Sequence, residues 1–313
     1  MIISASYRTD IPAFYGEWFR RRLDSGFCLT YNAFAHTATP VSLRPADVDG
    51  FVFWTKNLTP FWPTLTTVQA LGIPFVVQFT ITGYPRSLES AVPPSDRAMA
   101  TLQRLADHFG PEVAVWRFDP ILLTSVTDAD WHRDTFRRLC AAAQGATTEV
   151  VVSTVQWYRK TARNVRQAAM AHDFSVEDPS LPVQQALLAD LTAIAADHGL
   201  IFSVCAQPDR VPALGQPARC VDTERLSRVA SHPVAGSLHG NRPGCFCAQS
   251  VDIGAYDTCP HGCVYCYAVQ EPERARANRR AHDPEGAFLI PPAGAYTLAE
   301  SPSPSPALAQ LRF

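Results

Sequence analysis

The sequence has few of the features that several common classes of protein require. No stretch of it reaches the ~18 consecutive apolar residues of a membrane-spanning helix. The first ten residues, MIISASYRTD, lack the basic region and the long apolar stretch of a signal peptide. Neither a Walker-type nor a Rossmann glycine motif is present. We therefore expect a cytoplasmic protein with no membrane partner and without the nucleotide-binding loops that those motifs build.

An excess of charge of either sign is also missing. The chain of 313 residues has 27 Lys and Arg residues against 29 Asp and Glu residues, which gives a formal charge of −2. Nucleic acid is therefore a possible partner that the overall charge does not support. Lysine itself is nearly absent, because only Lys56 and Lys160 stand against 25 arginines. A lysine at the end of a predicted strand is thus a functional candidate.

Short, continuous apolar runs recur along the first two thirds of the chain, with helical patterns between them. Such runs are typical of parallel strands that are buried on both faces. We predict strands at residues 2–7, 51–55, 74–81, 113–118, 149–154 and 200–205. This alternation predicts an α/β fold, either a full or partial (β/α) barrel of about six to seven parallel strands or a doubly wound sheet, and we favour the barrel.

The helical patterns and the change in composition along the chain predict its organisation. Helices are expected at residues 10–26, 95–110, 128–143, 157–172 and 183–198, with Asp10 as an N-cap. Residues 1–205 would form the barrel strands and helices, and 206–285 a cysteine-rich segment that completes the barrel. Residues 286–313, rich in Pro and Ser, are expected to form a flexible tail.

Seven of the nine cysteines crowd into the last third of the chain. Three of them, Cys259, Cys263 and Cys266, have the spacing CxxxCxxC. A short loop of this kind can place three thiolates around an iron–sulfur cluster and leave the fourth iron without a protein ligand. The alternatives are unused thiols or a structural zinc site, although zinc sites usually present paired CxxC units.

This triplet, with Tyr265 directly before its last cysteine, resembles the signature of the radical S-adenosylmethionine superfamily, and the context YDTCPHGCVYCYA resembles its spore photoproduct lyase branch. The resemblance implies that Cys259, Cys263 and Cys266 hold a four-iron four-sulfur (4Fe-4S) cluster and that S-adenosyl-L-methionine binds the fourth iron. It also implies reductive cleavage to a deoxyadenosyl radical, an electron donor such as flavodoxin or ferredoxin, and a small-molecule or peptide substrate.

The order of the motifs differs from that of the superfamily, whose triplet normally precedes the barrel strands. Here the triplet comes last, yet the blocks SYRTDIPAFYGEW, FVFWTKN and FTITGYPRSLESAVPPSDR resemble, in order, the strands that follow it in the family. This suggests a circularly permuted barrel in which a strand at about 249–256 packs beside strand 2–7. Residues 1–285 as a whole also resemble a bacterial family described only as a domain of unknown function.

Polar residues follow the predicted strands at the end where barrels carry their active sites. Lys56 and Arg8 are the catalytic candidates, Lys56 as a compact charge for a substrate or cofactor carboxylate and Arg8 as a side chain that points into the barrel mouth. For Lys56, an ordinary solvated lysine at a strand end is an equally good interpretation.

Four further residues are candidates for binding the cofactor. Arg117 is placed to hold the carboxylate of S-adenosylmethionine, with Asp119 beside it, or the two pair with each other. Glu89 aligns with an acidic residue of the lyase branch, and the motif implies that Tyr265 stacks on the adenine. A solvated loop glutamate is the alternative for Glu89.

The remaining clustered cysteines are Cys205, Cys220, Cys245 and Cys247. Four thiolates match a complete set of ligands for a second iron–sulfur cluster or for tetrahedral zinc, and separate thiols are the alternative. We interpret the chain as a radical S-adenosylmethionine enzyme with an unknown substrate. The rival interpretations are a DNA-repair enzyme of the photoproduct lyase type and a non-catalytic iron–sulfur or zinc-binding protein.

Overall fold

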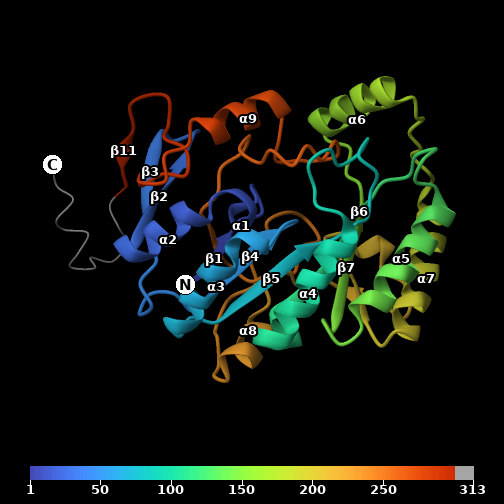
Figure 1. Cartoon of the computed structure of the whole chain (residues 1–313), viewed down its shortest axis with the longest axis horizontal. Coiled ribbons are helices and arrows are strands. Elements are labelled where there is room, and N and C mark those ends of the chain that lie inside the picture. Colours follow the sequence, from blue (N-terminus) through green and yellow to red (C-terminus); the bar gives the residue numbers. More distant parts are fainter. Residues whose placement is uncertain (300–313) are drawn as a thin grey trace.

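An eight-stranded, entirely parallel sheet forms the centre of the computed structural model, which describes residues 1–299 (Figure 1). The strand order is β10-β1-β4-β5-β6-β7-β8-β9. The strands span β1 Ile2–Ala5, β4 Gly50–Thr55, β5 Phe75–Thr80, β6 Ala114–Ile121, β7 Glu149–Thr154, β8 Ile201–Val204, β9 Gln216–Pro217 and β10 Val251–Asp252. The α/β fold and the six predicted strands are confirmed. The strand count exceeds the prediction because the two-residue β9 adds an edge strand.

Helices α2, α3, α4, α5 and α7 cover one face of this sheet. The α-helices span α1 Ile11–Phe14, α2 Gly16–Ser25, α3 Trp62–Ala70, α4 Ser95–Phe109, α5 Ala129–Ala143, α6 Arg159–His172, α7 Leu181–Asp197, α8 Thr223–Ala230 and α9 Pro272–Arg280. Side chains alternate along a strand, so Phe51 and Phe53 face the helices, where they pack with Phe19 of α2 and Leu65 of α3. This layer is the main hydrophobic core.

The opposite face of the sheet is covered by the chain between β9 and β10. Val52, Val76 and Val115 point to this side and pack against Leu226 of α8 and against Cys220. Within residues 1–299 no strand pairing joins β9 to β10, so the sheet is open. The inner face that a barrel would enclose is thus filled by residues 218–248.

The beginning and the end of the sheet-forming chain meet at β1 and β10. Ile3 pairs with Val251 and Ser4 with Asp252, as expected for a final strand that packs beside the first. The buried carboxylate of Asp252 accepts hydrogen bonds from Ser4 Oγ at 2.8 Å, Ser6 Oγ at 2.7 Å and the backbone N–H of Tyr7 at 3.0 Å. The carboxyl end of β10 is therefore fixed against the carboxyl end of β1.

A second, three-stranded sheet was not predicted. It consists of β2 Phe27–Asn32, β3 Thr37–Ser42 and β11 Thr297–Leu298, which lie side by side at one end of the molecule in Figure 1. Within the expected tail 286–313, Phe288 and Leu289 are buried, whereas residues 300–313 lie outside the described part. None of the helices among residues 1–299 is long and apolar enough to cross a membrane.

Candidate functional site

The cysteine triplet lies in the loop that follows β10, at the carboxyl edge of the sheet. Cys259, Cys263 and Cys266 line one hollow of about 320 Å³, which shows that this loop turns all three toward the same space. Gly262 makes the turn between the first two cysteines possible. Its φ is +70°, a conformation that favours glycine, and a Cβ atom there would also force the Ser90 hydroxyl to move.

The loop is attached to the first helix through Asp10. As predicted, Asp10 is an N-cap, because its Oδ1 accepts a hydrogen bond from Ala13 N at 2.8 Å. Its other oxygen, Oδ2, accepts from the backbone N–H of Lys56 at 2.7 Å and lies 2.8 Å from Nε2 of His261. One carboxylate therefore joins α1, the end of β4 and the cysteine loop, a role that the sequence did not suggest.

A buried polar group lies next to Cys263, one of the cysteines that line the hollow. Lys56 Nζ lies 2.7 Å from Glu89 Oε1, and the side chains are 11% and 3% exposed. The same oxygen accepts a hydrogen bond from Thr82 Oγ1 at 2.7 Å and another from the Tyr265 hydroxyl. Lys56, Glu89 and Tyr265, chosen separately from the sequence, are thus in direct contact.

The protonation states in this group follow from its burial and its charges. Burial opposes the charged form of Lys56, but Glu89 and Cys263 reverse this effect, so the pKa of Lys56 is raised. Burial and the charge of Glu89 raise the pKa of Tyr265 well above its usual value, so its hydroxyl keeps its proton. Glu89 consequently receives three donors, one of them cationic.

The three loop cysteines are surrounded by protein. Burial is the main reason that the pKa of each thiol, at Cys259, Cys263 and Cys266, is raised in the metal-free chain. Ala268 N donates to Cys266 Sγ at 3.3 Å. Across residues 1–299, no three His, Cys, Asp or Glu side chains are arranged to hold a single metal ion.

Arg8, the other catalytic candidate, lies against the last strand. Its Nε is 3.7 Å from Asp252 Oδ1 and is buried without a hydrogen-bond partner, and its guanidinium lies 5.3 Å from the centre of the Tyr256 ring. The Tyr267 hydroxyl donates to the carbonyl of Tyr7 next to it. Arg8 therefore shares the edge of the sheet with the triplet, held by the strand that carries the loop.

Arg117 and Asp119 form a pair, the alternative that the sequence left open. Arg117 donates from Nε at 3.2 Å and from Nη2 at 2.6 Å to Asp119 Oδ2. Its third nitrogen, Nη1, donates to Gln78 Oε1 at 3.1 Å and to Cys220 Sγ at 3.0 Å. Burial opposes the charge on Asp119, but Arg117 keeps its pKa lowered. The pair thus lies with the second set of cysteines.

The second set of cysteines comes together from three segments. Cys205 follows β8, Cys220 follows β9, and their sulfur atoms are 3.6 Å apart. Cys247 lies in the same buried cluster as Cys205 and Cys220, with Cys245 packed against it, and its sulfur accepts from Val221 N at 3.5 Å. All four are free thiols.

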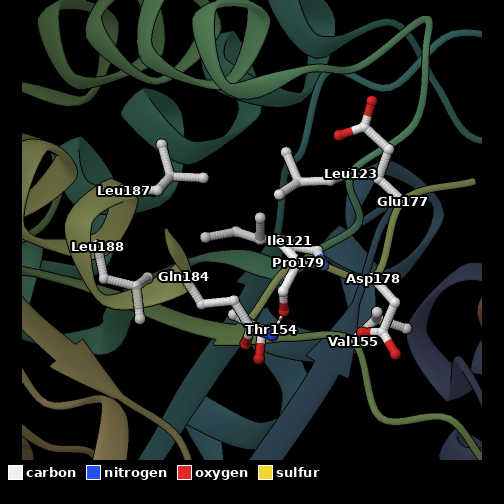
Figure 2. A pocket seen from close by; sticks show the side chains of 10 residues that line it. All are labelled: Ile121, Leu123, Thr154, Val155, Glu177, Asp178, Pro179, Gln184, Leu187 and Leu188. Atoms are coloured by element: carbon white, nitrogen blue, oxygen red, sulfur yellow. Dashed lines mark hydrogen bonds between the residues drawn. The ribbon is translucent and has the colours of Figure 1, made fainter. Parts of the chain in front are cut away.

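A further hollow, not predicted from the sequence, opens where β6 and β7 end. The volume of this hollow is about 350 Å³. Figure 2 shows the apolar side chains of Ile121, Leu123, Leu187 and Leu188 around it, with Thr154 and Gln184 on one side. The sequence contains only a weak indication of this hollow, because its walls come from strand ends and from α7, which are far apart in the sequence.

Comparison with known proteins places these features in a family. A search of curated proteins found no match. A family model described as a domain of unknown function, DUF1848, matches residues 2–268. The match runs from β1 through Cys266 and so includes both sets of cysteines and the Lys56–Glu89 pair. The chain belongs to the DUF1848 family.

Proposed function

We propose that this protein is a radical S-adenosylmethionine enzyme. The observation that carries the proposal is the convergence of Cys259, Cys263 and Cys266 on one hollow at the carboxyl edge of a parallel sheet. Beside that hollow lies the buried group of Lys56, Glu89 and Tyr265. Thiolate ligands, a water-poor wall and fixed charges are the elements that such an enzyme needs.

The donor set fits a 4Fe-4S cluster. Its three thiols bind three different irons, so they need not converge on one ion, and this agrees with the lack of a single-ion site among residues 1–299. The Ala268 N–H directed at Cys266 Sγ is the type of contact that tunes a cluster's potential. Cys259, Cys263 and Cys266 would hold the cluster, and S-adenosyl-L-methionine would complete it.

When bound, the cluster and its cofactor would supply a deoxyadenosyl radical for hydrogen abstraction from a small-molecule or peptide substrate, with electrons from a donor such as flavodoxin or ferredoxin. The protein's own residues would orient the cofactor and the substrate. Lys56 and Glu89 present opposite charges next to each other, which complements the carboxylate and the ammonium group of an amino acid. The burial of Lys56 and Glu89 keeps water away from these charges.

The proposal includes a more specific description of the fold. A partial barrel in circularly permuted order is supported by the position of β10, the last strand of the sheet in sequence, directly beside β1. It places the cysteine loop at the carboxyl edge of the sheet, where barrel enzymes carry their active sites. The coverage of the inner face by residues 218–248 would take the place of full closure.

The test is cleavage of the cofactor after anaerobic reconstitution with iron and sulfide. We expect a reduced, cluster-loaded protein to convert S-adenosylmethionine to methionine and deoxyadenosine, measured by mass spectrometry. Cys263→Ala should abolish cleavage, whereas Cys140→Ala, a buried cysteine of α5 far along the chain from the loop, should not. Intact cofactor after reduction of the fully loaded protein would refute the proposal and favour a non-catalytic metal-binding protein.

A further inference from the structure

We infer that Cys205, Cys220, Cys245 and Cys247 bind a second iron–sulfur cluster, separate from the triplet. This inference goes beyond the proposed function and does not require it. The four thiols come from the chain after β8, the chain after β9 and the loop before β10, which are distant in sequence. Together they supply the four ligands that a complete cluster takes.

The positions of the four cysteines are the first observation. Cys205 Sγ and Cys220 Sγ are 3.6 Å apart, and Cys247 belongs to the same buried cluster, with Cys245 packed against it. The four thiols therefore form one continuous group. The separation of 3.6 Å is much longer than the ~2.05 Å of a disulfide bond.

Two arginines directed at these sulfurs are the second, independent observation. Arg117 Nη1 donates to Cys220 Sγ at 3.0 Å, and Arg242 Nη2 donates to Cys205 Sγ at 3.7 Å. Arg117 is 4% exposed. A cluster held by four thiolates carries net negative charge, and a buried negative group requires compensating donors. Two guanidinium groups aimed at sulfur provide that compensation.

The other two cysteines of the chain show what ordinary buried thiols look like here. Cys28 on β2 and Cys140 on α5 are both fully buried within the main hydrophobic core. Hydrophobic packing is a sufficient account of each, as is usual for a single buried cysteine. Cys205 and Cys220 differ from them because their sulfur atoms are adjacent and each accepts a hydrogen bond from an arginine side chain.

The second cluster would lie close to the first site. Asp119, which pairs with Arg117, is near enough to Lys56 to contribute to the charge around it. The Arg117–Asp119 pair therefore contacts the second group of cysteines through Cys220 and lies near Lys56, which adjoins the first group.

The decisive experiment uses the full chain without its first site, Cys259→Ala/Cys263→Ala/Cys266→Ala. After anaerobic reconstitution, we expect this variant to retain about half of the wild-type iron and acid-labile sulfide, with an iron–sulfur signal in Mössbauer spectra. Adding Cys245→Ala, at a half-exposed position, should lower the retained iron sharply. Cys28→Ala/Cys140→Ala is the matched control and should retain the full wild-type amount.

Three outcomes would overturn the inference: loss of all iron from the triplet variant, stoichiometric zinc without sulfide, or a disulfide among the four cysteines in the freshly isolated protein. Circular dichroism of each variant establishes that it is folded. Cofactor cleavage is measured in parallel on the wild type. A triplet variant that keeps its cluster beside a wild type that leaves the cofactor intact would sink the proposed function alone.

An additional readout tests the role of the arginines. Removing a positive charge beside a cluster stabilises its oxidised form, so Arg242→Gln should lower the midpoint potential of the second cluster. The measurement is a redox titration of the triplet variant with and without the substitution. An unchanged potential would contradict the contact between Arg242 and this centre.

Discussion

The buried Lys56–Glu89 pair gives the sharpest prediction about stability. In Glu89→Ala, Lys56 loses its carboxylate partner at 2.7 Å, while its side chain is only 11% exposed. Removal of one partner of a buried ion pair typically costs about 3–5 kcal/mol. Thr82 and Tyr265 lose their acceptor as well, so we expect the upper part of that range.

The assay is urea unfolding of the metal-free protein under reducing conditions. Glu17→Ala is the matched control, since Glu17 pairs with Arg21 on the exposed face of α2, and its loss should change the free energy of unfolding far less than the loss of Glu89. Lys56→Met/Glu89→Ala should be more stable than Glu89→Ala alone because it leaves no unpaired buried charge. A Glu89→Ala protein within about 1 kcal/mol of the wild type would refute this description of the pair.

Three further predictions concern other parts of the chain. Burial lowers the pKa of His132 to about 4, so the unfolded chain binds the proton first as the pH falls below 6.5, and about 3 kcal/mol of stability should be lost between pH 6.5 and about 4. Urea unfolding at several pH values should show that the free energy of unfolding depends less on pH in His132→Gln than in the wild type. An equal dependence would show that His132 is not the cause. Asp252→Ala should cost about 3–5 kcal/mol because it removes the acceptor of Ser4 and Ser6 and the partner of Arg8, and thermal unfolding will show whether β10 depends on this contact. Gly262→Ala should reduce iron incorporation several-fold at the triplet, since its φ is +70° and its new methyl group meets Ser90; wild-type iron content would contradict the described turn.

The sequence predicted the parallel sheet well because its strands are buried on both faces. Residues 149–154 have a run of three valines and are all buried, and the strand β7 has the predicted bounds. The hairpin of β2 and β3 escaped prediction because most of its residues are only partly buried and Pro40 interrupts its second strand. β9 has only two residues, one of them proline, and therefore leaves no pattern.

The candidate site could be predicted by residue type but not by partner. Lys56 and Glu89 were chosen separately. They are 33 residues apart in the sequence, and nothing in that separation indicates that Lys56 and Tyr265 both donate to the Glu89 carboxylate. Arg117 illustrates the limit most clearly. Side-chain alternation along β6 places it on the inner face with Val115, where it meets Cys220, a residue 103 positions later.

Long-range contacts of this kind also explain what Asp10 and His261 do. Asp10 was predicted as a helix cap, which is a local property of the sequence. Its second oxygen lies 2.8 Å from His261, 251 residues away, and that contact depends on the pairing of β10 with β1. The position of the triplet is therefore a consequence of the sheet order.

The central claim is that the triplet binds an iron–sulfur cluster with one iron open to S-adenosylmethionine. Electron paramagnetic resonance of the reduced, reconstituted protein, recorded with and without S-adenosylmethionine, tests it most directly. We predict that the cofactor changes the spectrum of the wild type and leaves that of Cys259→Ala/Cys263→Ala/Cys266→Ala unchanged. A wild-type spectrum that does not respond to the cofactor, in protein shown to be fully loaded with iron and sulfide, would contradict the account.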